Sequence, residues 1–198
     1  MRDRSAIEMR ISLMVSPNVF CRYDPTKDEC STNLDRSVHD GGELLEIRIE
    51  PLTELRVAYI RNVGPYGLSP TLKTLQRVTR WARSRRLLEA AQVLGIPWHN
   101  PRVTPAEELW YDACVSVPER FESDHPSISV QVIPAGSYLV RECRAEDGDL
   151  ETPWQEFLAW YEKSEWEMSD GPCFEVYRNG CYSDPTGNWE MALHIPIV

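Results

Sequence analysis

The stretch Pro172-Cys173-Phe174-Glu175-Val176-Tyr177 follows a turn signal, Ser169-Asp170-Gly171. Aromatic and β-branched residues alternate with others over its last four positions, which predicts a half-buried strand. One face of that strand carries Phe174 and Val176, and the other carries Glu175. Most strand carboxylates are solvated, so the ordinary interpretation makes Glu175 a surface residue. If this face lines a concave site instead, Glu175 is an anionic contact flanked by aromatic groups, which suits a cationic or polar aromatic ligand.

The overall composition narrows the class of protein. With 198 residues, 42% of them hydrophobic, the chain is long enough for one domain of ordinary size, or two small ones, with a sizeable core. The formal net charge of −10 opposes non-specific binding to the phosphates of nucleic acids. An acidic chain suits a cationic ligand or a basic protein partner better.

The sequence lacks the usual motifs for metals, phosphates and catalytic serines. None of the six cysteines forms a Cys-x-x-Cys pair, and the four histidines are scattered along the chain. We therefore expect no zinc or other metal site. There is no P-loop and no Gly-x-Ser-x-Gly motif, and we expect no cofactor. A buried structural thiol explains Cys114 and Cys173 better than a nucleophilic role does.

The N-terminal part gives little evidence of function. Residues from Met1 to Val15 are interrupted by charged side chains and form no apolar leader segment. No run of the chain is long and apolar enough to span a membrane. We expect a cytoplasmic protein with reduced thiols and no membrane contact. Residues 1–42 are polar and turn-rich and have no helix-turn-helix pattern, so they are expected to be an N-terminal extension that does not bind nucleic acid directly.

Two halves of the chain repeat one order of elements. Residues 43–117 and 127–198 each read strand, strand, helix, strand, strand. The helices are expected to begin at Ser69-Pro70 and at Thr152-Pro153, where a capping side chain precedes a proline, and Pro51 is expected to end the first strand. This order suggests internal duplication, and two such halves around a pseudo-two-fold axis would leave a groove between the helices. The expected strands are 45–50, 55–63, 93–98, 109–117, 128–132, 137–142, 174–177 and 189–197.

Carboxylates and aromatic rings are the candidate site residues. Glu175 and Glu190 lie on strands that a hairpin-like connection would make neighbours. Two carboxylates in a cleft could divide acid and base work, or bind a cation. Tyr111 and Tyr177 fall in phase with polar residues of their strands and are the better cleft candidates. Trp154 lies on the apolar stripe of a helix and is expected in the core.

A basic cluster lies on the first predicted helix. In a chain of this acidity a solvated helix face is the commoner explanation, and a nucleic-acid patch is the rarer one. We therefore assign this cluster no binding role. Its members are Lys73, Arg77, Arg80 and Arg83.

Several segments, taken in their order and spacing, resemble one known family. They are VAYIRNVGPYG (57–67), LGIPWHNP (94–101), TPAEELWYDACVSVP (104–118), VQVIPAGSYLV (130–140), PWQEFLAWY (153–161) and PCFEVYRN (172–179). With them the chain resembles the GyrI-like small-molecule-binding family, which includes SbmC-type DNA gyrase inhibitors and the effector-binding domains attached to AraC- and MerR-type regulators. The last segment is most similar to the stand-alone gyrase-inhibitor branch. The resemblance covers about Leu45 to Val198, and residues 43–198 are expected to form one domain of this type.

The resemblance implies an α+β fold of two βαββ repeats, with an antiparallel sheet and two helices that flank a ligand cleft. It also implies that Glu175 is the cleft carboxylate and that Tyr111 is a wall residue. The sequence departs from the family pattern at two places. Trp110 replaces the usual arginine, and Pro97-Trp98-His99 stands where an aromatic-aromatic-acid triplet is usual, which suggests a reshaped cleft floor.

Three functions stay open at this point. The first is a stand-alone protein that binds bulky cationic or aromatic small molecules, with toxin protection or modulation of DNA gyrase as its role. The second, implied by some members of the family, is a hydrolase of cyclopropane-bearing genotoxins, in which Glu175 would position or deprotonate water and Tyr111 would polarise the electrophile. The third is a regulatory protein whose acidic surface meets a basic partner. The expected ligand-site residues are Glu175, Tyr111, Trp98, Tyr177, Trp110 and Glu190.

Overall fold

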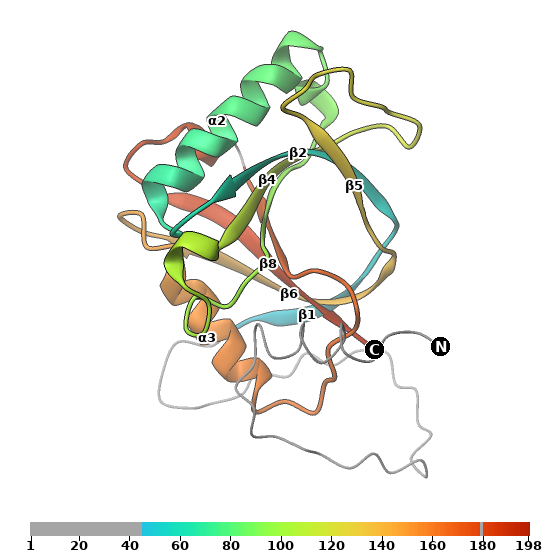
Figure 1. Cartoon of the computed structure of the whole chain (residues 1–198). Coiled ribbons are helices and arrows are strands. Elements are labelled where there is room, and N and C mark those ends of the chain that lie inside the picture. Colours follow the sequence, from blue (N-terminus) through green and yellow to red (C-terminus); the bar gives the residue numbers. More distant parts are fainter. Residues whose placement is uncertain (1–44, 179) are drawn as a thin grey trace.

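The computed structural model describes residues 45–178 and 180–198, and the expected extension at residues 1–42 lies outside this range. Within the described residues, eight strands form one sheet whose ladders are all antiparallel, and two α-helices lie beside it (Figure 1). This confirms the predicted α+β class. The elements are β1 (Ile47–Leu52), β2 (Leu55–Val63), α2 (Leu68–Ser84), β3 (Val93–Pro97), β4 (Trp110–Ser116), β5 (Ser129–Ile133), β6 (Gly136–Ala145), α3 (Glu151–Tyr161), β7 (Phe174–Tyr177) and β8 (Trp189–Ile197).

The strand order is β1-β6-β8-β7-β3-β4-β2-β5. It reads the same from either end when β1 is exchanged with β5, β2 with β6, β3 with β7 and β4 with β8. Each half of the chain gives its first strand to the edge of the other half, because β1 pairs with β6 and β5 pairs with β2. The two halves meet in the middle of the sheet, where β3 pairs with β7. The relation of the halves by a pseudo-two-fold axis stays a prediction.

The sheet curls on itself, and both helices lie outside the curl (Figure 1). We call the side that faces the helices the outer face. There, Leu75 of α2 and Phe157 of α3 join Leu193 of β8 in one buried cluster. The inner face has its own buried cluster, which includes Leu94 of β3 and Phe174 of β7. Because both faces are covered, central strands can be buried on both sides.

Strand β7 corrects the first prediction. All four of its residues are buried, so it is not half-buried. The alternation of residue types correctly predicts a strand, but β7 lies between β3 and β8 with an apolar cluster on each side. Glu175 is therefore 3% exposed, and the interpretation of this residue as solvated is wrong.

Both helix starts differ from the prediction. Helix α2 begins at Leu68 directly after Gly67, without a side-chain cap. Helix α3 begins at Glu151, and the carboxylate of Asp149 accepts the backbone N–H groups of Glu151 and Thr152 at 3.0 and 2.9 Å. Asp149 thus does the work that the sequence suggested for Thr152.

Pro51 does not end β1, which continues to Leu52. A proline is tolerated there because β1 is an edge strand that pairs with β6 alone, so the missing N–H group breaks no second ladder. Among the described helices, none is long and apolar enough to cross a membrane.

Because His194 on β8 is buried, we expect the stability of the fold to fall at acidic pH. Its ring is 7% exposed and stacks on Phe174 at 4.2 Å between centroids. Burial lowers the pKa of His194 from 6.5 to about 4. The unfolded chain takes up the proton first, so the free energy of unfolding should fall by about 1.4 kcal/mol per pH unit from about pH 6.5 down to about pH 4. Denaturant titrations at several pH values measure this slope.

The matched control uses a second histidine. The variant His194→Gln should lose this component of the slope, whereas His125→Gln should keep it because His125 is exposed. Equal slopes in all three proteins would show that His194 is not responsible for the acid sensitivity.

Candidate ligand-binding cavity

A cavity of about 440 Å³ opens on the outer face, between the N-terminal ends of the two helices. It lies over the middle of the sheet, since β3, β4 and β7 all contribute to it. The loop from β2 to α2 and the loop after β3 supply further walls. Its lining includes Tyr66, Thr71, Pro97, His99, Leu109, Tyr111, Asp149, Glu151, Trp154, Leu158 and Glu175.

The charged groups of the cavity are acidic. Glu175 lies in its floor, and Asp149 and Glu151 lie at the start of α3. No lysine or arginine is found among the described residues that line it. His99 adds no fixed positive charge, because burial, with a smaller effect from Arg61, lowers its pKa. The cavity therefore favours a positively charged ligand.

Glu175 receives hydrogen bonds on both of its carboxylate oxygens. The hydroxyl of Tyr111 lies 3.0 Å from Oε1, and the hydroxyl of Tyr177 also contacts Oε1. The indole Nε1 of Trp154 donates to Oε2 at 3.0 Å. The two tyrosine hydroxyls lie 2.7 Å from each other. Strands β4 and β7 and helix α3 therefore hold the carboxylate in one position.

Burial governs the acid–base properties of this group. It raises the pKa of Glu175, and the hydrogen bonds from Tyr177, Trp154 and Tyr111 oppose that rise. Burial and the neighbouring carboxylate raise the pKa of Tyr111 and of Tyr177 well above the ordinary value, so both phenols keep their protons. Burial thus favours the neutral acid form of Glu175, whereas the three hydrogen bonds favour the anion.

Gly95 makes the approach of Tyr111 to Glu175 possible. It lies on β3, opposite Ala113 of β4 on one side and opposite Glu175 of β7 on the other. A Cβ atom at this position would lie 2.0 Å from the Tyr111 hydroxyl oxygen and 2.7 Å from Glu175 Oε1. The phenol of Tyr111 thus crosses β3 through the space that a side chain would fill. We infer that glycine is required here for close approach and not for backbone freedom.

The sequence from residue 45 to residue 198 matches the GyrI-like small molecule binding domain. The chain belongs to the GyrI-like family. The DNA gyrase inhibitor of Erwinia billingiae is 30% identical to it over 156 residues, which cover 77% of this chain and 97% of that protein. The DNA gyrase inhibitor of Salmonella typhimurium is 31% identical over 156 residues, with 77% and 96% covered.

The fold of this GyrI-like chain is similar to that of solved structures. The crystal structure of the EcmrR C-terminal domain matches with a TM-score of 0.58, covering 79% of this chain and 99% of that one. Sequence identity is 15% in this match, so the likeness concerns the fold alone.

The GyrI-like cavity brings together three of the six predicted site residues. Glu175 and Tyr111 line it. Tyr177 lies behind them, and its hydroxyl group is hydrogen-bonded to the Tyr111 hydroxyl and to Glu175 Oε1. Two aromatic residues that the sequence did not single out for the site also line it. Trp154, which was expected in the core, holds Glu175, and the hydroxyl of Tyr66 accepts the N–H of His99 at 3.0 Å.

The other three predicted residues do not line the cavity. Trp98 donates its indole N–H to Asp112, which lies on the opposite side of β4 from Tyr111. Trp110 is 41% exposed and packs its ring 4.3 Å from the guanidinium of Arg61. Neighbouring residues of a strand point to opposite faces, so the prediction that Trp110 and Tyr111 share one cleft is corrected.

Glu190 is also placed away from the cavity. It forms an ion pair with Arg144, its partner in the β6–β8 ladder. Strands β7 and β8 are neighbours, as predicted, but Glu175 lies opposite Leu193. Side chains alternate between the two faces along a strand. Because Glu190 is three positions from Leu193, it points to the face opposite to that of Leu193 and Glu175. The predicted carboxylate pair of Glu175 and Glu190 is therefore not formed.

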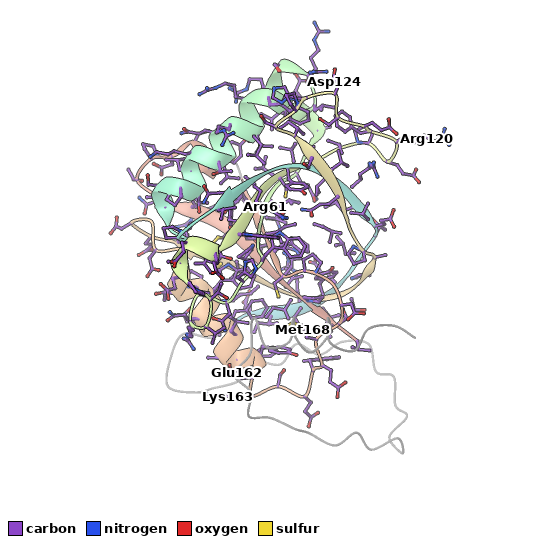
Figure 2. All side chains as sticks on the ribbon, viewed as in Figure 1. Arg61, Arg120, Asp124, Glu162, Lys163 and Met168 are labelled. Carbon is purple, nitrogen blue, oxygen red and sulfur yellow. The ribbon has the colours of Figure 1, made fainter. Side chains whose placement is uncertain are left out.

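Asp112 anchors a second polar cluster on the inner face. It is fully buried and accepts two hydrogen bonds from Arg61, both at 2.7 Å. Trp98 and Gln131 donate to it at 2.6 and 3.2 Å. Figure 2 labels Arg61 within the curl of the sheet. Within residues 45–178 and 180–198, no three His, Cys, Asp or Glu side chains gather as they would to hold a metal ion.

Proposed function

We propose that this GyrI-like domain binds bulky, lipophilic cations in the cavity between α2 and α3. The observation that carries the proposal is the buried carboxylate of Glu175 in a cavity whose described lining includes no lysine or arginine. A buried anion is costly unless it is paired. A cation in the cavity would supply the missing partner, and Asp149 and Glu151 at the start of α3 would add long-range attraction.

The walls suit a ligand with a large apolar surface. Tyr66, Trp154 and Leu158 offer aromatic and aliphatic area around the carboxylate. Aromatic faces attract a cation by their quadrupole, most strongly where water is excluded. A cavity of about 440 Å³ is in the usual range for small-molecule sites.

The hydrogen bonds around Glu175 define the kind of cation further. Three donors from the protein already occupy its oxygens. The ligand therefore needs to supply positive charge but no N–H group of its own. Quaternary ammonium and phosphonium ions with aromatic substituents have this chemistry, and they carry little of the hydration that a primary ammonium ion would lose on entry.

The place of the cavity supports the two-repeat interpretation of the fold. The strand order reads the same from both ends, and Glu175 lies at the β3–β7 junction where the two halves meet. We infer that the described part of the chain contains two βαββ repeats, β2-α2-β3-β4 and β6-α3-β7-β8, each preceded by one edge strand, and that the cavity lies between them. DNA gyrase is the protein partner to test, because related proteins are named DNA gyrase inhibitors. A supercoiling assay with purified gyrase, with and without bound cation, addresses that role.

Titration with tetraphenylphosphonium tests the binding proposal. Replacing Glu175 with glutamine keeps the shape of the side chain and removes its charge. We expect the affinity to fall by about 10-fold to 150-fold, because a desolvated charged contact contributes about 1.5–3 kcal/mol. Isothermal titration above neutral pH measures the change.

Glu190→Gln is the matched control. It is the same substitution on the neighbouring strand, but it lies on the other face, so affinity should stay at the wild-type value. Equal losses in both variants would contradict a role for the cavity.

Mass spectrometry after incubation with cyclopropane-bearing compounds tests the hydrolase alternative. A water-addition product that forms with the wild type and not with Glu175→Gln would show that the protein turns the compound over and does not only bind it.

A further inference from the structure

Three oxygen atoms form a closed triangle in the floor of the cavity. They are Glu175 Oε1 and the hydroxyl oxygens of Tyr111 and Tyr177. Each lies within hydrogen-bond distance of the other two. All three side chains are buried, with exposures of 3–5%. Water therefore has little access to these oxygens, so the three groups must satisfy one another's hydrogen bonds.

The number of protons decides whether the triangle is stable. When Glu175 is ionised, the two phenols supply two protons for three contacts. If both phenols donate to Glu175, their oxygens face each other at 2.7 Å with no proton between them. If one phenol donates to the other, its own contact with Oε1 has none. Either way two electron-rich oxygens are held together without a hydrogen bond, which is unfavourable in a buried site.

A third proton removes this conflict. With the proton on Oε1, Glu175 donates to Tyr177, Tyr177 donates to Tyr111 and Tyr111 donates back to Oε1. Each contact then has one hydrogen. The second carboxyl oxygen still accepts the indole N–H of Trp154 at 3.0 Å, as a neutral carbonyl oxygen does.

We propose that the ligand-free cavity holds Glu175 as a neutral carboxylic acid, and that a bound cation takes the place of its proton. This inference rests on the proposed function, because it concerns how the same site takes up its ligand. On binding, the O–H bond of Glu175 breaks, the proton leaves to the solvent and the carboxylate stays beside the cation. The net charge of the site is then the same before and after binding.

The groups around Glu175 agree with a neutral acid. Tyr111 and Tyr177 stay protonated, and Tyr66 beside the cavity has its pKa raised to about 12, mainly by burial. On β6, burial raises the pKa of Cys143 to about 12, so this thiol stays neutral. Arg141, also on β6, donates its hydrogen bonds to Glu156 and to the carbonyl of Pro153, and not to Glu175.

The other titratable groups do not favour an anion either. On the cavity wall, burial lowers the pKa of His99, so this ring brings no positive charge. Glu151 and Asp149, at the start of α3, add negative charge only. Burial raises the pKa of Glu175 and thereby also favours the neutral acid. No described cation is thus committed to Glu175 in the ligand-free state.

The consequence is a pH-dependent affinity. Below the raised pKa of Glu175, a cation must displace a proton, so affinity rises by about tenfold for each unit of rising pH. Above that pKa the affinity becomes constant. Tetraphenylphosphonium does not titrate, so any such dependence comes from the protein. Isothermal titration from about pH 5 to about pH 9, in buffers of different ionisation enthalpy, measures both the slope and the number of protons released.

The variants separate this proposal from the proposed function. Glu175→Gln resembles the neutral acid, so it should fold and bind weakly with no pH slope. Glu190→Gln should keep the slope. Binding by the wild type that is independent of pH and releases no proton would overturn the exchange of proton for cation while leaving the proposed function in place.

Infrared spectroscopy gives a readout that needs no ligand. A protonated carboxyl group absorbs at higher frequency than a carboxylate, and at about pH 7 ordinary carboxyl groups are ionised. Ligand-free wild type should show this band, Glu175→Gln should lack it and added tetraphenylphosphonium should remove it. Should no cation bind at any pH, the proposed function fails, and absence of the band would by itself overturn the neutral acid.

Discussion

Replacing Arg61 with methionine is expected to lower the free energy of unfolding by about 3 kcal/mol. Asp112 is fully buried, and Arg61 supplies two of its four hydrogen bonds, in a fork that fits both carboxylate oxygens. Without Arg61, the carboxylate keeps only Trp98 and Gln131 as donors and has no counter-charge. The Arg61 side chain is 29% exposed, so water can reach the vacated space, which places the loss at the lower end of the range for broken buried ion pairs.

Denaturant titration of wild type and variant measures this loss, and Arg144→Met is its control. Arg144 pairs with Glu190 through side chains that are 68% and 44% exposed, so removing it should cost less than about 1 kcal/mol. Adding Asp112→Asn to the Arg61 variant should restore part of the stability, because the unpaired charge is then gone. Equal losses from the two arginine variants would mean that burial of Asp112 does not matter.

Much of the fold was predictable because the alternation of residue types along a strand reflects which of its side chains are buried. Each predicted strand is found within a few residues of its expected place. What alternation could not give is the position of a strand in the sheet. Strand β7 reads as half-buried, yet it is central and covered on both sides. The predicted starts of both helices also differ from the structure, because α2 begins after Gly67 without a side-chain cap and the carboxylate that caps α3 belongs to Asp149, three residues before the predicted cap.

The site was predictable only in part, because its contacts join distant segments. The pattern and the family resemblance pointed to Glu175 and Tyr111, which are 64 positions apart and hydrogen-bonded. The resemblance could not show that Trp110 lies on the other side of β4. The apolar stripe of its helix predicts Trp154 in the core, and its ring does pack against the outer cluster, but its indole nitrogen also donates a hydrogen bond to Glu175.

Gly95 illustrates the same limit and gives the other large prediction. In the sequence it is one small residue in an apolar run, and nothing in its neighbours marks it. In the fold it is the gap through which Tyr111 reaches Glu175. Gly136→Ala is a fitting control, because Gly136 is also a strand glycine and a Cβ there would approach only Tyr138, at 3.9 Å. We expect that variant to stay within about 0.5 kcal/mol of the wild type.

The variant Gly95→Ala should lose about 3 kcal/mol of unfolding free energy and more than about tenfold in affinity for tetraphenylphosphonium. The new Cβ atom would overlap both the hydroxyl oxygen and the Cζ atom of Tyr111, at 2.0 and 2.6 Å, so the ring must move and its hydrogen bond to Glu175 must break. Thermal melting and titration measure the two effects. The double variant with Tyr111→Ala makes room for the methyl group, so the two stability losses should be less than additive. Additive losses, or normal binding by Gly95→Ala alone, would show that the contact between Tyr111 and Glu175 is not what the glycine protects.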